Sequence, residues 1–134
     1  MTAPDTRPLA EPRLKQSARY LLAIAMVGAG LSHFVCPEPF IRIVPRALPA
    51  AALLVQISGA IELALGLGLA LRRSRWLAAW GLVALYVAVF PANINMALNG
   101  IALDPAHPTP TWFAWARLPL QALFIAWAVW VRKP

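Results

Sequence analysis

Long apolar runs separated by short polar segments dominate the chain. Four of these runs approach the length needed to cross a bilayer, since its hydrocarbon core is about 30 Å thick and takes about 20 apolar residues in a helix. The runs are Tyr20–Val35, Ala50–Leu71, Trp76–Leu98 and Thr111–Val131. Only Glu62 and Arg117 interrupt them with a formal charge. The pattern therefore predicts an all-α protein with four membrane-spanning helices.

The first run is the shortest, and Leu14 to Ala18 can lengthen it if Lys15 and Arg19 extend their charged ends to the membrane interface. No small-x-small cleavage site follows this run, so we expect the helix to be retained. We expect a polar basic arm over residues 1–18 and one transmembrane domain over 19–134. Its predicted helices cover about 19–35, 50–71, 76–98 and 111–131.

Composition supports this class of protein. Of 134 residues, 60% are hydrophobic and 13% charged, against about 45–50% and about 25% in a soluble domain. These values argue against a water-soluble globule, and a disordered basic tail is excluded because disorder requires low hydrophobicity. Cys36 is the only cysteine, which excludes an internal disulfide and a paired-cysteine redox or zinc motif.

The net charge of +7 comes from basic clusters between the apolar runs, not from one basic stripe, so we expect no nucleic-acid partner. Nine Lys and Arg residues lie in the N-terminal arm, the 72–75 connection and the C-terminal tail, whereas three lie on the other side. The positive-inside rule then predicts an inner-membrane protein with both termini in the cytoplasm. The short 72–75 connection favours an antiparallel four-helix bundle, packed through glycines and alanines.

Residues 36–50, which we call the cap segment, alternate prolines with apolar side chains and two arginines. This composition predicts a stiff segment that lies on the outer interface and covers the bundle. The other outer loop, 99–111, carries turn signals such as Asn99-Gly100 and Asp104-Pro105.

Glu62 is the most informative polar residue within the runs. It lies twelve residues into the second run, a depth of about 18 Å at about 1.5 Å per residue. Ser58, Gly59 and Gly66 share its helical face, which would turn the carboxyl group into the bundle. A carboxyl group at this depth is a candidate functional group, but a structural ion pair or a protonated acid bonded to backbone explains it equally well.

His33 lies near the outer end of the first helix. One histidine does not make a metal or haem site, and His107 in a proline-rich loop is a poor partner for it. An acid/base or ligand-binding role and a hydrogen-bonded structural role remain alternatives for His33.

Pro91 opens the third helix, because a proline leaves the carbonyl four residues earlier, near position 87, without its helical donor. Asn93 falls on the face of Tyr86, whereas Asn95 points nearly opposite, so Asn93 is the better candidate for an inward role. The alternative is that the asparagines only repair the kink.

Arg117 and Gln121 lie one turn apart near the start of the fourth helix, on either side of Pro119. A helix that started after Arg117 would be short for the bilayer, so we expect the longer, kinked helix from Thr111. Arg117 then becomes the expected counter-charge for Glu62 or for an anionic ligand group.

Polar residues from all four helices converge at one depth. We predict an outward-opening ligand pocket beneath the cap segment, with Glu62 as its floor and Phe34, Tyr86 and Phe90 as aromatic walls. Its polar members are His33, Gln56, Glu62, Asn93, Arg117 and Gln121.

The order of several motifs resembles the DoxX-like family of small four-helix membrane proteins. The motifs are His33-Phe34, then Pro39-x4-Val44-Pro45-x2-Leu48-Pro49, then Gly59-x2-Glu62, then Phe90-Pro91-Ala92-Asn93. The resemblance runs from about Arg19 to Val131 and implies an integral membrane protein of a functionally mixed family often linked to redox systems. Its pattern maps onto His33, Glu62 and Asn93, while the single Cys36 departs from neighbouring groups that depend on cysteine pairs.

The sequence is compatible with three functions. The first is a redox-associated membrane component that binds a quinone or similar amphiphile and receives electrons from a partner protein. The second is a non-catalytic assembly partner, and the third is an intramembrane enzyme with Glu62 as base, His33 as acid and Arg117 as anion holder. Transport is a weaker fourth, since it would require the bundle to form a homo-oligomer.

Overall fold

The computed structural model describes residues 11–133, and most of these are helical, with no strand among them. The helices are α1 (Arg13–Val35), α2 (Glu38–Ile43), α3 (Ala51–Ala70), α4 (Arg75–Asn99) and α5 (Thr111–Val131). All except α2 are long and apolar enough to cross a membrane, which confirms the all-α class and the four expected long apolar helices. Helix α1 begins at Arg13, so the last residues of the expected arm, 13–18, are helical.

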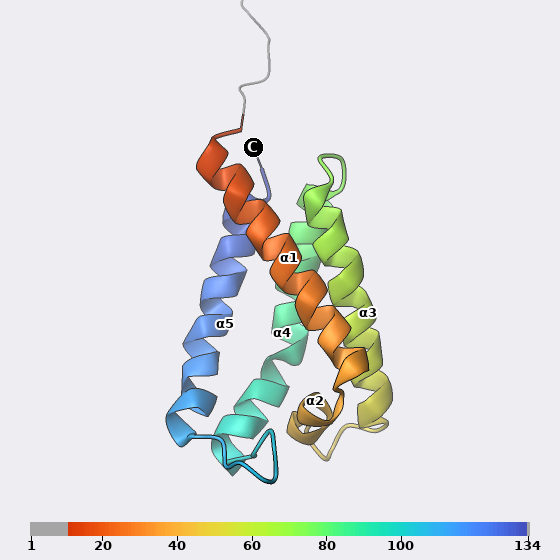
Figure 1. The fold of residues 1–134 in the computed structure, drawn as a ribbon, viewed down its shortest axis with the longest axis vertical. Helices are drawn as coiled ribbons and strands as arrows, with labels where there is room; N and C mark the ends of the chain where they lie inside the picture. Colours follow the sequence, from red (N-terminus) through yellow and green to blue (C-terminus); the bar gives the residue numbers. More distant parts are fainter. Residues whose placement is uncertain (1–10, 134) are drawn as a thin grey trace, which may run out of the picture.

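The four long helices lie side by side, and the chain runs alternately up and down through them (Figure 1). The most extensive contacts join α1 to α3 and α4 to α5, which are consecutive spans. Helix α3 also packs on α4, and α1 makes smaller contacts with α5. The beginning of α1 and the end of α5 lie at the same end of the molecule, and α2 lies at the opposite end (Figure 1).

Glycines let the backbones of α1 and α3 approach closely. A Cβ atom on Gly59 would lie 2.6 Å from the Cβ atom of His33, and one on Gly30 would lie 2.7 Å from the Gly59 carbonyl oxygen. Gly66 is similarly tight against the Ala23 carbonyl oxygen, at 3.0 Å. The α1–α3 interface is therefore of the small-residue type that membrane helices use.

We expect Gly59→Ala to lower the free energy of unfolding by about 1–3 kcal/mol, because the new methyl group has to separate two packed backbones. Thermal unfolding in mild detergent, followed by circular dichroism, measures the change. Gly28→Ala is the matched control, since a Cβ atom there meets nothing within 4 Å. If both variants melt at the same temperature, the two helices do not cross at Gly59.

Buried apolar side chains form two clusters. The larger one, which includes Leu22, Leu69, Leu82 and Val131, lies in the half of the bundle where α1 begins. The smaller one joins Ile43 of α2 to α4 and α5. Many other large apolar side chains stay on the surface; examples are Ile24, Leu67, Leu77, Val87 and Leu123. Such an apolar exterior is consistent with contact with a lipid bilayer.

The expectation that Arg19 extends to the interface is wrong, because its side chain is only 1% exposed. Its Nη1 atom donates to the carbonyl oxygen of Leu69 at 2.7 Å, in the last turn of α3. Glu11 pairs with Arg19 at 3.2 Å and with Arg75 at 3.1 Å. The final carbonyl groups of a helix lack internal donors, and the Arg19 guanidinium supplies one. We call Glu11, Arg19 and Arg75 the arginine cluster.

The cap segment contains the short helix α2, which packs against α3 and α4. Asn95 fastens it to α4, since its Nδ2 atom donates to the Ile43 carbonyl oxygen at 2.9 Å. The cap segment thus lies across the end of the bundle opposite the beginning of α1 and the end of α5 (Figure 1).

Candidate functional site

A cavity of about 810 Å³, the large cavity, lies between the helices next to the cap segment. Its walls are mostly apolar and come from all five helices. Examples are Met26, Phe40, Val55, Leu85, Tyr86 and Phe124. Its polar lining includes five of the six predicted site residues: His33, Glu62, Asn93, Arg117 and Gln121.

The first polar group of the large cavity is the pair of His33 on α1 and Glu62 on α3. The His33 Nδ1 and Glu62 Oε2 atoms are 3.3 Å apart, and the two side chains are 9% and 12% exposed. Neither atom has a well-aligned hydrogen bond, although both are buried. The distance defines an ion-pair contact, but the missing alignment leaves hydrogen-bonding capacity unused. A ligand that enters the cavity can satisfy that capacity.

Local packing holds the His33 ring in this place. The ring lies edge-on to Phe40 of α2, with centroids 4.0 Å apart. On the α3 side, a Cβ atom on Gly59 would lie 3.0 Å from the His33 Nδ1 atom, so the glycine makes room for the ring. The cap segment and the α1–α3 crossing therefore position the imidazole together.

The second polar group joins α4 to α5. The Arg117 Nε atom donates to Asn93 Oδ1 at 3.1 Å, and Asn93 Nδ2 donates to Gln121 Oε1 at 2.6 Å. Gln121 Nε2 then donates to the Tyr86 carbonyl oxygen. This carbonyl lies one residue before the position that Pro91 was expected to open, so a side chain does bond the backbone beside the kink. We call Arg117, Asn93 and Gln121 the amide chain.

Arg117 is not the counter-charge of Glu62. Within residues 11–133, the close polar contact of Glu62 is made with His33, and no ion pair joins Glu62 to Arg117. Arg117 bonds Asn93 because α5 packs extensively on α4, and its guanidinium also lies over the Phe113 ring, 5.9 Å from the centroid. The cavity thus has two separate polar groups instead of one central ion pair.

Gln56 does not belong to the site. It is exposed and does not line the large cavity. It lies six residues before Glu62, which places it about 120° away around the helix. Its depth along the helix was the reason to expect it in the pocket, but its side chain lies on a helical face that does not line the cavity.

Of the three expected aromatic walls, only Tyr86 lines the cavity; its hydroxyl donates to the Met26 sulfur at 2.9 Å. Phe34 and Phe90 are 47% and 37% exposed and lie outside it. Sequence reasoning missed Phe40 and Phe124. Phe124 could have been found from its position three residues after Gln121, on the same helical face, but Phe40 depends on the fold of the cap segment.

The large cavity reaches the apolar side surface of the molecule. Several residues that line it are also partly exposed, among them Leu54, Ile57 and Ile61 on α3 and Trp112 and Leu120 on α5. An apolar rim of this kind suits a ligand that arrives from the bilayer.

His107 and Cys36 take no part in the cavity. His107 bonds Asp104 in the 100–110 loop, with Nδ1 and Oδ2 2.7 Å apart, and this bond and the Ala106 amide hold the pKa of Asp104 below its usual value. Cys36 is exposed after the end of α1. Across the part of the chain that the structure describes, no three His, Cys, Asp or Glu side chains come together as metal ligands.

The model of a family described as a domain of unknown function, DUF8561, matches residues 22–132. The chain belongs to this family. The match covers all five helices except the first turns of α1. Neither the curated proteins nor the solved structures include a match to the chain. The family description assigns no function.

Proposed function

We propose that this family member is an integral protein of the inner membrane that binds a small amphiphile in the large cavity, with a quinone as the favoured ligand. Both termini lie in the cytoplasm in this proposal. The excess of basic residues in the arm, the 72–75 connection and the tail supports this orientation.

The observation that carries the proposal is the pairing of apolar walls with two separate polar groups in one cavity. A quinone has an apolar ring system and two carbonyl oxygens on opposite sides of it. One carbonyl oxygen would accept a hydrogen bond from the amide chain, and the other would meet His33 and Glu62. The unused hydrogen-bonding capacity of His33 Nδ1 and Glu62 Oε2 favours a bound partner at that end.

In the redox version of the proposal, two electrons come from a separate partner protein, and two protons convert the quinone to a quinol. Glu62 and His33 are the groups that would transfer a proton to the carbonyl oxygen beside them. The resemblance of the motifs to the DoxX-like family supports this version.

The test is an absorption spectrum and a mass analysis of a solvent extract of the full chain, purified in mild detergent. We expect a stoichiometric quinone or similar amphiphile with the unmodified protein. Glu62→Gln and His33→Ala should lose at least half of it while they stay folded, because each removes a polar partner of the ligand. Gln56→Ala is the matched control, since Gln56 lies outside the cavity.

The second candidate function is that of an assembly partner, and the amide chain favours it. Arg117, Asn93 and Gln121 bond one another and the Tyr86 carbonyl oxygen without a ligand. If no amphiphile copurifies and the Glu62 and His33 variants only melt at lower temperature, the polar residues hold the bundle together and ligand binding is ruled out as their role.

A further inference from the structure

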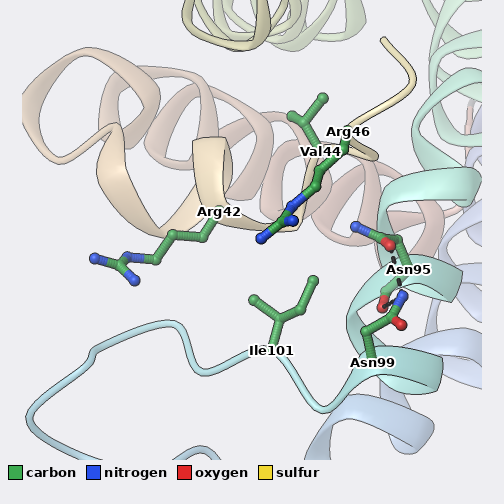
Figure 2. Close-up of a pocket in the computed structure, with 6 residues that line it drawn as sticks. All are labelled: Arg42, Val44, Arg46, Asn95, Asn99 and Ile101. Atoms are coloured by element: carbon green, nitrogen blue, oxygen red, sulfur yellow. Dashed lines mark hydrogen bonds between the residues drawn. The ribbon is translucent and has the colours of Figure 1, made fainter.

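A second cavity, of about 500 Å³, lies on the cap segment. Its lining is mostly polar and basic, whereas the lining of the large cavity is mostly apolar. We call it the cap cavity. Figure 2 shows its lining: Arg42, Val44 and Arg46 from the cap segment, and Asn95, Asn99 and Ile101 from the end of α4 and the loop after it. In this view the Arg46 guanidinium lies in the middle of the cavity, and the Arg42 guanidinium extends away from it, on the side opposite the two asparagines (Figure 2).

The asparagines form a fixed wall of the cap cavity. Asn99 Nδ2 donates to Asn95 Oδ1 at 2.8 Å, and Asn95 Nδ2 donates to the Ile43 carbonyl oxygen at 2.9 Å. These bonds tie α4 to the cap segment at Ile43, the residue after Arg42, while the Arg42 and Arg46 side chains are exposed and can turn toward the wall.

The guanidinium groups of Arg42 and Arg46 have N–H donors that no hydrogen bond uses within the described residues. In the described chain, no hydrogen bond or ion pair joins Arg42 or Arg46 to another residue. Glu38, one turn before Arg42 in α2, makes no such pair with it. Asp104 is the acidic group whose charge acts on Arg42, but its carboxyl oxygens already accept bonds from His107 and from the Ala106 amide. The cap cavity therefore keeps an excess of positive charge.

We propose that the cap cavity is a binding site for a phosphate group, held by the guanidinium groups of Arg42 and Arg46 against the wall of Asn95 and Asn99. A guanidinium presents paired N–H donors that match two phosphate oxygens, which makes Arg suited to this ligand. The site does not depend on what binds in the large cavity.

Two sources can supply the phosphate group, a lipid headgroup and the free ion. The surroundings favour the headgroup. Leu48 and Leu98 nearby in the chain are 47% and 67% exposed, and the cavity lies at the end of a membrane-length helix. Phospholipid phosphates lie at that level in both leaflets of a bilayer, and a guanidinium group is suited to bind them.

The experiment uses the full chain in mild detergent and native mass spectrometry with two lipid probes, dioleoyl phosphatidylglycerol and dioleoylglycerol, which have the same tails but differ in the phosphate. Inorganic phosphate, followed by phosphorus NMR, is the third probe. The variant is Arg42→Gln with Arg46→Gln. The matched control is Arg72→Gln with Arg73→Gln, because these arginines are also exposed and adjacent to a helix end, but at the opposite end of the bundle.

We expect phosphatidylglycerol to bind and dioleoylglycerol not to bind. The Arg42/Arg46 variant should weaken phosphatidylglycerol binding at least about tenfold, since charge-assisted hydrogen bonds are lost, while the Arg72/Arg73 variant keeps it. Binding of inorganic phosphate alone, lost in the same variant, supports the site with the free ion as its source.

Equal binding of all probes by the Arg42/Arg46 variant and the unmodified chain overturns the proposal. So does an equal loss in both double variants, which would show a general charge effect. If the Arg42/Arg46 double variant loses its helical spectrum, the single variants at 42 and 46 are compared with a single variant at 72 by the same criteria.

Discussion

Arg19→Met should lower the free energy of unfolding by about 3–5 kcal/mol, the usual cost of removing one partner from a buried ion pair. The guanidinium donates to the Leu69 carbonyl oxygen and pairs with Glu11, and it is 1% exposed. Methionine keeps an apolar stem of similar length but removes the donor to the Leu69 carbonyl oxygen at the end of α3. It also leaves Arg75 as the remaining partner of the Glu11 carboxylate. Chemical unfolding in mixed micelles, followed by circular dichroism, measures the change.

Arg13→Met is the control for this prediction, because Arg13 is an exposed arginine on the same helix. We expect Arg13→Met to change stability by no more than about 0.5 kcal/mol, as surface substitutions usually do. Equal effects of the two substitutions would show that Arg19 reaches the interface, as the sequence pattern suggested, and does not bridge α1 and α3.

Asn93→Leu should have the second largest effect. It breaks the amide chain in the middle and leaves Arg117 Nε and Gln121 Oε1 without their partner. A buried polar group without a partner costs about 1–3 kcal/mol, and Gln121 is 5% exposed. We therefore expect the free energy of unfolding to fall by about 2–4 kcal/mol. This is somewhat below the sum of the costs for the two groups, because Arg117 is only half-buried and can turn toward water.

Asn95→Leu separates this effect from a general loss of asparagine in α4. Asn95 bonds the cap segment, and it lies outside the large cavity. We expect a loss of about 1 kcal/mol for its single backbone hydrogen bond. A cost for Asn93→Leu no greater than that for Asn95→Leu would mean that the amide chain does not stabilise the bundle.

The sequence was most informative where depth and helical face agreed. Glu62 and Asn93 satisfied both criteria, and both line the large cavity. Gln56 satisfied only the depth criterion and is exposed. The four spans followed from length and hydropathy alone, since a helix in lipid has to satisfy its own backbone.

Contacts between helices could not be predicted in the same way. Arg19 reaches the end of α3 and Arg117 reaches Asn93, and both contacts depend on which helices are neighbours. Run length and depth give no such information, so they suggested an Arg19 that extends to the membrane interface and an Arg117 that is the counter-charge of Glu62 or of an anionic ligand group. Helix α2 was missed because six residues with a proline are too few to show a periodic pattern.

The division of contacts into α1 with α3 and α4 with α5 has a consequence for biogenesis. Each pair is a hairpin of consecutive spans, so its interface joins segments that leave the ribosome one after the other. Helix α3 of the first hairpin packs on α4 of the second across the short 71–74 connection, but other contacts between the hairpins, such as Glu11 with Arg75 and Tyr86 with Met26, span 60 or more residues of chain. These long-range contacts can form only after α4 has been synthesised, and the arginine cluster then joins the start of α4 to the first hairpin.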